Sequence, residues 1–189
     1  MANNVLVLNG SPRKNGNTAA LVERFSAGAQ EAGSKVTCFD VARMNIHPCR
    51  GCLSGGKDPA SPCVQKDDMD KVYAAYLEAD TIALASPMYC WSFTAQLKAT
   101  LDRLFALMEV SMRAGEATPV PRAKSSALIM PAEDASYRNF APIVTYYEAL
   151  TARMGWTDAG RVLVGGVYLA GDIAENPALD EAYRLGSAL

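Results

Sequence analysis

The sequence is short of several features that mark large classes of proteins. Its 189 residues include a single histidine, and 18 basic residues against 20 acidic ones leave a net charge of −2. So small an imbalance creates no broad electrostatic field that would attract nucleic acid or an anionic membrane surface. We therefore expect neither as a partner, and any positively charged site has to be local.

Long apolar runs are also missing. The N-terminal stretch MANNVLVLNG has neither the basic start nor the apolar core of a secretory signal. The longest uncharged stretch, residues 81–97, is interrupted by Pro87 and by polar side chains, which is typical of a strand, a loop and a helix start rather than a membrane span. The five cysteines, an odd number, suit a reducing compartment. Together these features predict a soluble, cytoplasmic protein.

Apolar runs alternate with helical patterns along a chain that has no repeat and no low-complexity linker, so we expect a single domain over residues 1–189. Buried strands are predicted over residues 5–8, 35–40, 81–85, 125–130 and 161–164. Helices are predicted over residues 21–32, 67–77, 97–108 and 140–154, with a short, weakly docked helix in the tail from Gly171 and loops over 41–66 and 109–123. This alternation predicts a three-layer α/β/α sandwich around a five-stranded parallel sheet of order 2-1-3-4-5.

Residues 8–21, LNGSPRKNGNTAAL, place polar residues between the first strand and the first helix. Successive backbone N–H groups and the helix N-terminus form a concavity that suits an anion such as phosphate. Donor side chains and cations are supplied by Ser11, Arg13, Lys14, Asn15, Asn17 and Thr18. A plain connecting turn is the alternative. The pattern is neither GxxxxGK[ST] nor GxGxxG, which argues against ATP hydrolysis and against a permanently bound dinucleotide.

A second candidate loop, SPMYCWSF at residues 86–93, follows the third strand. Pro87 restricts the turn, backbone amides can bind a polar ring edge, and Tyr89 or Trp91 offers a flat surface for stacking. These aromatic residues could instead be core or dimer contacts. The loop MPAEDAS after the fourth strand should reach the same edge through Ala132 and Glu133.

Together these stretches resemble a known family. GSPRKNGNT after a short apolar strand is similar to the phosphate loop of the NAD(P)H-dependent FMN reductase branch of the flavodoxin-like superfamily, and SPMYCWSFTAQLKATLDRL resembles that family's S-P-x-Y loop and the helix after it. The resemblance covers residues 4–110. It implies a flavodoxin-like fold, with the FMN phosphate on Ser11, Arg13, Asn17 and Thr18. It places the flavin ring against Pro87, Met88, Tyr89, Cys90, Trp91 and Ser92.

Three cysteines follow the second strand, at Cys49, Cys52 and Cys63. The segment resembles the cysteine loop of iron–sulfur flavoprotein relatives, but Gly55 stands where their third cysteine is expected. A [4Fe–4S] cluster would then need a ligand from Cys38, Cys90 or a partner chain. Zinc with His47 as fourth ligand and a Cys49–Cys52 redox dithiol are further alternatives. We favour packing thiols or a remnant of an ancestral site, and assign no metal.

The resemblance implies an oxidoreductase that takes a hydride from NADH or NADPH and passes electrons to a small-molecule acceptor or a redox protein. FMN carries the chemistry, so no side chain is assigned as catalytic. Apart from the flavin loops, the sequence shows no dinucleotide-binding fingerprint, so the nicotinamide nucleotide would bind transiently over the flavin and leave before the acceptor enters. This predicts ping-pong kinetics. The resemblance also implies a homodimer or homotetramer, because reductases of this family are commonly dimers or tetramers. The alternatives are a flavodoxin-type electron carrier, an iron–sulfur flavoprotein relative with a degenerate cysteine motif, and a non-enzymatic nucleotide-binding module.

Overall fold

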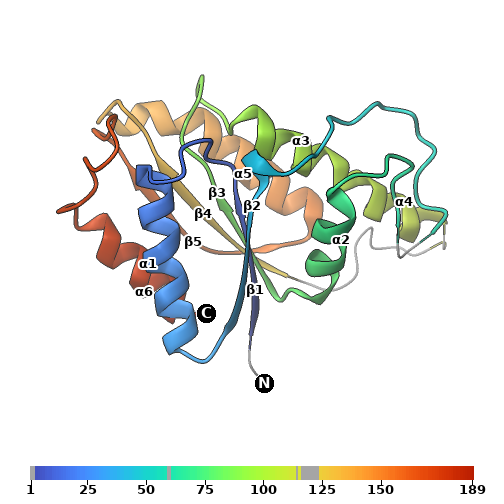
Figure 1. The fold of residues 1–189 in the computed structure, drawn as a ribbon, viewed down its shortest axis with the longest axis horizontal. Coiled ribbons are helices and arrows are strands. Elements are labelled where there is room, and N and C mark those ends of the chain that lie inside the picture. The colour runs from blue at the N-terminus through green and yellow to red at the C-terminus, as the bar shows by residue number, and fades with distance from the viewer. Residues whose placement is uncertain (1–2, 59–60, 114, 116–123) are drawn as a thin grey trace.

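The sheet has the predicted strand order. The computed structural model describes residues 3–58, 61–113, 115 and 124–189. Its five strands are β1 (Asn4–Asn9), β2 (Lys35–Asp40), β3 (Thr81–Ala85), β4 (Ser125–Pro131) and β5 (Thr157–Val164). They are all parallel and run β2-β1-β3-β4-β5 across the sheet. The flavodoxin-like topology predicted from the sequence is confirmed (Figure 1).

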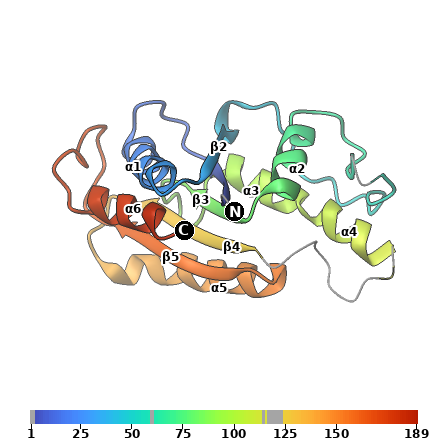
Figure 2. The same cartoon turned by 90° about the horizontal axis from the view of Figure 1, so that it is seen from below.

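Helices cover both faces of this sheet (Figure 2). One face carries α1 (Asn17–Glu31) and α6 (Ala178–Ser187). The other carries α2 (Met69–Glu78), α3 (Ala95–Arg103), α4 (Phe105–Arg113) and α5 (Ala141–Met154). Two short 3₁₀ turns lie at Val41–Arg43 and Tyr137–Phe140. In the described part of the chain, no helix is both long and apolar enough to cross a lipid bilayer.

Strand β1 explains why there are two cores. Because successive side chains of a strand point to opposite faces, Val5 and Val7 join the core beneath α1 and α6. Leu6 and Leu8 join the core beneath the other four helices. All four side chains are buried, as expected for a central strand of a parallel sheet that is covered on both faces.

The structure corrects the prediction of one continuous helix over residues 97–108. The chain forms two helices, α3 and α4, which meet at Leu104. There the Leu104 N–H donates to the Leu101 carbonyl at 3.1 Å, which makes a tighter turn of the 3₁₀ type. The Arg103 carbonyl accepts a hydrogen bond from the Tyr73 hydroxyl at 2.8 Å, so a partner on α2 holds the backbone at the break. Helix α4 also extends into the predicted loop over 109–123, whose residues 114 and 116–123 lie outside the described part of the chain.

Helix α6 also departs from expectation, because it is not weakly docked. It lies beside α1 in both views (Figures 1 and 2). Glycines allow the close approach: a Cβ atom added at Gly28 would lie 2.1 Å from the Tyr183 carbonyl oxygen, and one at Gly186 would lie 2.0 Å from that of Phe25. The backbones of the two helices are therefore in direct contact.

Candidate functional site

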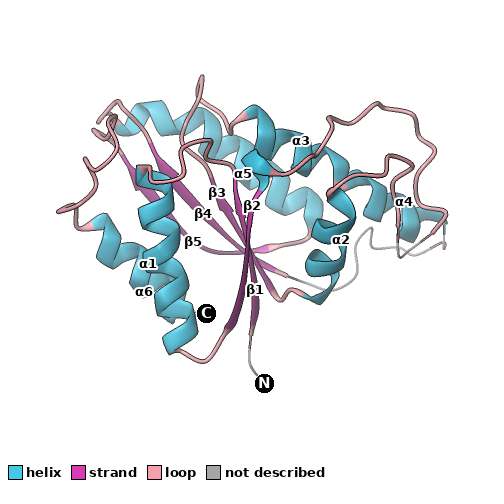
Figure 3. Cartoon of the chain, in the orientation of Figure 1, coloured by secondary structure: helices cyan, strands magenta, loops and turns pink. Residues whose placement is uncertain are grey.

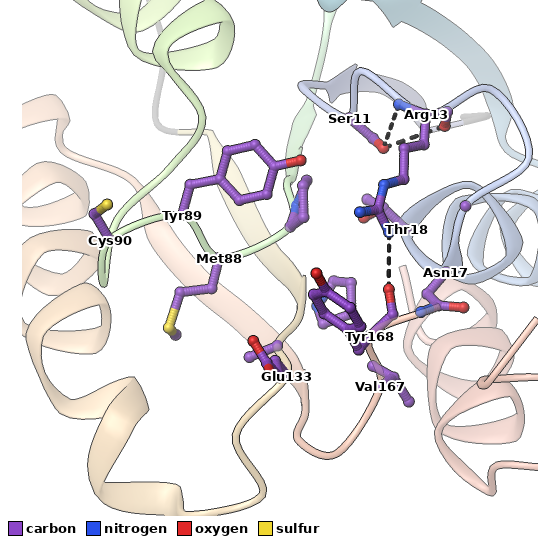
Figure 4. A pocket seen from close by; sticks show the side chains of 14 residues that line it. Ser11, Arg13, Asn17, Thr18, Met88, Tyr89, Cys90, Glu133, Val167 and Tyr168 are labelled. Carbon is purple, nitrogen blue, oxygen red and sulfur yellow. Dashed lines mark hydrogen bonds between the residues drawn. The ribbon is translucent and has the colours of Figure 1, made fainter. Parts of the chain in front are cut away.

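The loop between β1 and α1 is held by its own side chains. The Ser11 N–H donates to Asn9 Oδ1 at 3.0 Å. The Arg13 N–H donates to Ser11 Oγ at 3.3 Å (Figure 4). Gly16 occupies the N-cap position of α1, and none of the described side chains caps the helix there. The N–H groups of the first turn, which carry roughly half a positive charge, are thus available to an anion.

The loop after β3 forms a tight hairpin. Met88 N–H donates to the Pro131 carbonyl at 2.9 Å, which ties the loop to the end of β4. Tyr89 and Ser92 exchange two backbone hydrogen bonds of 3.0 Å. Between them, Cys90 and Trp91 both adopt left-handed dihedrals, with φ of 48° and 60°. Positive φ at both central residues is the pattern of a type I′ turn, which places Cys90 and Trp91 at the tip of the hairpin.

Thr94 joins these two loops. Its hydroxyl donates to the Gly10 carbonyl at 2.8 Å, and its N–H donates to Ser86 Oγ at 3.0 Å. The same hydroxyl accepts a 3.4 Å hydrogen bond from Leu97 N–H and so caps α3. A Cβ atom at Gly10 would lie 2.7 Å from Thr94 Oγ1, so glycine is needed for this approach. Thr94 is fully buried, and no sequence motif indicates its bridging position.

The loops after β4 and β5 are bonded to each other at the same edge. Ala132 N–H donates to the Val164 carbonyl at 2.7 Å, and Val167 N–H returns a 3.0 Å bond to the Ala132 carbonyl. Gly166 N–H donates to the Glu133 carbonyl at 3.1 Å. The loops that follow β1, β3, β4 and β5 all leave the sheet at its carboxyl edge (Figure 3).

A cavity of about 360 Å³ lies where these four loops meet (Figure 4). Most of the predicted site residues line it: Ser11, Arg13, Asn17, Thr18, Pro87, Met88, Tyr89 and Cys90. Ala132 and Glu133, expected from the loop after β4, line it as well. Trp91 and Ser92 are on the same hairpin but do not line the cavity. The Trp91 ring is 59% exposed, and its Nε1 lies 3.4 Å from Asn139 Oδ1.

Four further residues line it: Gly16 and Pro131, which lie in loops predicted to reach the site, and Val167 and Tyr168, which were not predicted. The last two belong to the loop after β5, where the sequence GVYL shows no phosphate-binding pattern. The Tyr168 carbonyl accepts a 2.8 Å hydrogen bond from Arg13 Nη1, and the Arg13 guanidinium carbon lies 5.9 Å from the centre of the Tyr168 ring. Tyr168 thereby places an aromatic side chain next to Arg13, the only cation among the described residues that line the cavity.

The cysteine loop lines a separate, small cavity of about 40 Å³. Cys49, Cys52 and Cys63 share it with residues of α3 and α4, and none of the described residues lines both this cavity and the larger one. A Cβ atom at Gly55 would lie 2.4 Å from Glu109 Oε2, so the carboxylate crowds the position where iron–sulfur flavoproteins are expected to have their third cysteine. Of the other cysteines, Cys90 lines the larger cavity, and Cys38 lines a third pocket beside the end of β2.

His47, the fourth ligand that a zinc site would need, is hydrogen-bonded to a carboxylate instead: its Nδ1 lies 3.1 Å from Asp67 Oδ2. Among the described residues, no three histidine, cysteine or acidic side chains converge on a point that could hold a metal ion. A cubane cluster needs about four thiolates, and this donor set does not fit one.

A buried ion pair fixes the end of this loop. Arg103 and Asp67 have fully buried side chains that bond to each other, and Arg103 also donates to the His47 carbonyl at 3.3 Å. Burial raises the pKa of the Asp67 carboxyl. The hydrogen bonds from Arg103 and from the backbone N–H groups of His47 and Met69 outweigh this effect and lower the pKa to about 2.

Comparison with known proteins identifies the family. The family model for NADPH-dependent FMN reductase matches residues 3–129, which is more than half of the chain. The chain belongs to this family, a flavin-dependent oxidoreductase family within the flavodoxin-like fold. It is 36% identical over 98 residues to an iron–sulfur flavoprotein of Archaeoglobus fulgidus, covering 50% of this chain and 42% of that protein.

Two further similarities agree. Over 103 residues the chain is 33% identical to the FMN-dependent NADH:quinone oxidoreductase of Rhizobium meliloti, covering 51% of this chain and 50% of that protein. The chain thus spans about half the length of the curated relatives it matches. The structure of NAD(P)H:quinone oxidoreductase from Methanothermobacter marburgensis superimposes with a TM-score of 0.75 at 19% identity, over 99% of this chain and 96% of that one, which shows the shared fold.

FMN is the cofactor of this family, and the described residues fit it. The cavity volume of about 360 Å³ lies within the range of roughly 300–1,000 Å³ that is usual for ligand sites. The cavity combines a helix N-terminus, the Arg13 cation and hydroxyl groups at one end with a proline and tyrosine loop at the other. A Cβ atom at Gly16 would lie 3.0 Å from Arg13 Cβ, so the absence of a side chain keeps the anion cradle open.

Proposed function

We propose that this protein is an FMN-dependent oxidoreductase that accepts a hydride from NADPH or NADH and delivers electrons to a small-molecule acceptor such as a quinone. The observation that carries the proposal is the junction of the phosphate-type loop and the tyrosine hairpin in one cavity. Membership of the NADPH-dependent FMN reductase family supports it. FMN, when bound, supplies the hydride and electron chemistry.

The residues of the chain would bind and orient the cofactor. Ser11, Arg13 and Thr18 line the end of the cavity next to the first turn of α1, where hydroxyl, guanidinium and backbone N–H donors suit a phosphate. Met88 and Tyr89 line the hairpin end, where an apolar and aromatic surface suits the flavin ring. This division assigns the phosphate to one loop and the ring to the other.

The arrangement also predicts the kinetic order. The sequence holds no second dinucleotide fingerprint, so the nicotinamide nucleotide and the acceptor would use the same cavity in turn. Parallel lines in double-reciprocal plots at several acceptor concentrations would support this order. Intersecting lines would show that donor and acceptor bind together.

We also propose that the protein forms a homodimer or homotetramer. Analytical ultracentrifugation would test this by measuring the mass of the particle in solution.

Anaerobic mixing of the FMN-loaded protein with NADPH or NADH, without any partner protein, tests the function directly. We expect the visible absorbance of the bound flavin to bleach and to recover when a soluble quinone is added, on the order of one quinone per flavin for a two-electron transfer. Bound flavin that bleaches with dithionite but with neither nucleotide would instead indicate a flavodoxin-type carrier. A protein that takes up no FMN would be a different kind of binding module.

A further inference from the structure

The loop after β5 contains a carboxylate that fixes two successive peptide groups. Asp172 Oδ2 accepts the backbone N–H of Tyr168 at 2.8 Å and that of Leu169 at 2.7 Å. The Asp172 N–H donates back to the Leu169 carbonyl at 3.2 Å, which closes the turn. The side chains of Tyr168 and Leu169 are 56% and 63% exposed. The direction of these two peptide groups therefore depends on Asp172 more than on side-chain packing.

The carbonyl oxygen of the second of these peptide groups, that of Tyr168, and the carbonyl oxygen of the next peptide group, that of Leu169, both bond to the phosphate-type loop. The Tyr168 carbonyl accepts the 2.8 Å bond from Arg13 Nη1, and the Leu169 carbonyl accepts a 3.0 Å bond from Asn17 Nδ2. Gly171 N–H donates to Asn17 Oδ1 at 3.2 Å, so both ends of the Asn17 amide are bonded to this loop. Figure 4 shows the bond between Arg13 and Tyr168 at the side of the cavity.

From this geometry we infer that Asp172 is a positioning residue for the cofactor phosphate: its carboxylate fixes the peptide group between Tyr168 and Leu169, and the Tyr168 carbonyl of that group holds the Arg13 side chain in place. This inference rests on the proposed function. A guanidinium has five N–H donors, so one bond to Tyr168 orients the group and leaves donors for phosphate. A side chain ordered before binding loses less conformational entropy on binding, which strengthens the complex.

The loop has other anchors, so the effect of Asp172 should be local. Val167 and Ile173, on either side of the turn, are buried in the core beneath α1 and α6. The bond from Val167 N–H to the Ala132 carbonyl does not involve Asp172. Loss of the carboxylate should therefore free the two peptide groups without unfolding the sheet or releasing α6.

Affinities for FMN and for riboflavin, which lacks the phosphate, test the inference, and flavin fluorescence measures both. We expect Asp172→Ala to weaken FMN binding about tenfold, the effect of one or two hydrogen bonds, and to leave riboflavin binding unchanged. Asp172→Asn keeps an acceptor oxygen and should bind FMN within about twofold of the parent. Asp134→Ala is the matched control, because Asp134 also accepts a backbone N–H in an edge loop, that of Ser136 at 2.7 Å, whereas the Ser136 carbonyl accepts the Asn139 N–H instead of a side chain of the phosphate-type loop.

A double-mutant cycle with Arg13→Ala separates positioning from a general effect. If Asp172 acts through Arg13, the loss from Asp172→Ala should shrink to about twofold or less when Arg13 is already alanine. Additive losses, an equal loss of riboflavin affinity, or an unchanged FMN affinity in Asp172→Ala would each overturn the inference while leaving the proposed function intact. A parent protein that binds neither flavin would overturn both.

Discussion

At the scale of single residues, buried polar residues with several hydrogen-bond partners organise the molecule. Thr94 bonds to both the phosphate-type loop and the loop after β3, and Asp67 bonds to Arg103 and to two backbone N–H groups. Neither residue lines the larger cavity. No sequence motif marks such residues, because the partners that make them important, such as Gly10 for Thr94 and Arg103 for Asp67, lie far away in the sequence.

The Asp67–Arg103 pair gives a prediction about pH. Replacement of Asp67 by asparagine leaves the buried guanidinium without its counter-charge and should reduce the free energy of unfolding at pH 7 by about 3 kcal/mol. Because the pKa of Asp67 falls from 3.8 to about 2 on folding, its contribution is complete above about pH 4 and is lost as the pH falls through 2.

Urea unfolding of the parent and Asp67→Asn between pH 7 and pH 2.5 measures this effect. The difference in unfolding free energy should be constant down to about pH 4 and then shrink. Asp68→Asn is the matched control, because Asp68 pairs with an exposed lysine, Lys71, and should cause a much smaller loss. A difference between parent and Asp67→Asn that grows on acidification would contradict the assigned ion pair.

At the scale of elements, the sequence predicts most of the sheet, and the errors have physical causes. Fully buried strands such as β3 appear as continuous apolar runs, so their bounds were found. Strand β5 begins at Thr157, before the predicted 161, because its first residues are exposed and polar and carry no apolar signal. The break between α3 and α4 depends on the contact from Tyr73 to Arg103, which separation in sequence conceals.

The contact between α1 and α6 gives the second prediction. A methyl group in Gly186→Ala would meet the Phe25 carbonyl oxygen at 2.0 Å, and this oxygen is part of the α1 backbone and cannot rotate away. We expect a loss of about 1–3 kcal/mol in unfolding free energy, measured by denaturant titration. Ser187→Ala, an exposed change in the same turn, should alter stability by less than about 0.5 kcal/mol. Full stability of Gly186→Ala would mean that the helices are farther apart.

At the scale of the whole molecule, the cavity is assembled from loops that are far apart in the chain. The residues of the phosphate-type loop form a contiguous pattern, which is why they could be predicted. Tyr168 could not, because it bonds to Arg13 through a backbone carbonyl 155 positions away, and a backbone carbonyl has no residue signature. The family model ends at residue 129, so the walls formed by Ala132, Glu133 and Tyr168 lie beyond it.

A cavity assembled in this way exists only in the folded protein, so its ligand should stabilise the whole fold. FMN at about 100 times its dissociation constant should add about 2.7 kcal/mol to the unfolding free energy, which corresponds to a rise of about 5–10 °C in Tm for a domain of this size. Differential scanning calorimetry measures the shift. Riboflavin at the same concentration is the control and should raise Tm by much less, because Arg13 and the first turn of α1 have no phosphate to bind. Equal shifts from the two flavins would place the ligand away from the loop that joins β1 to α1.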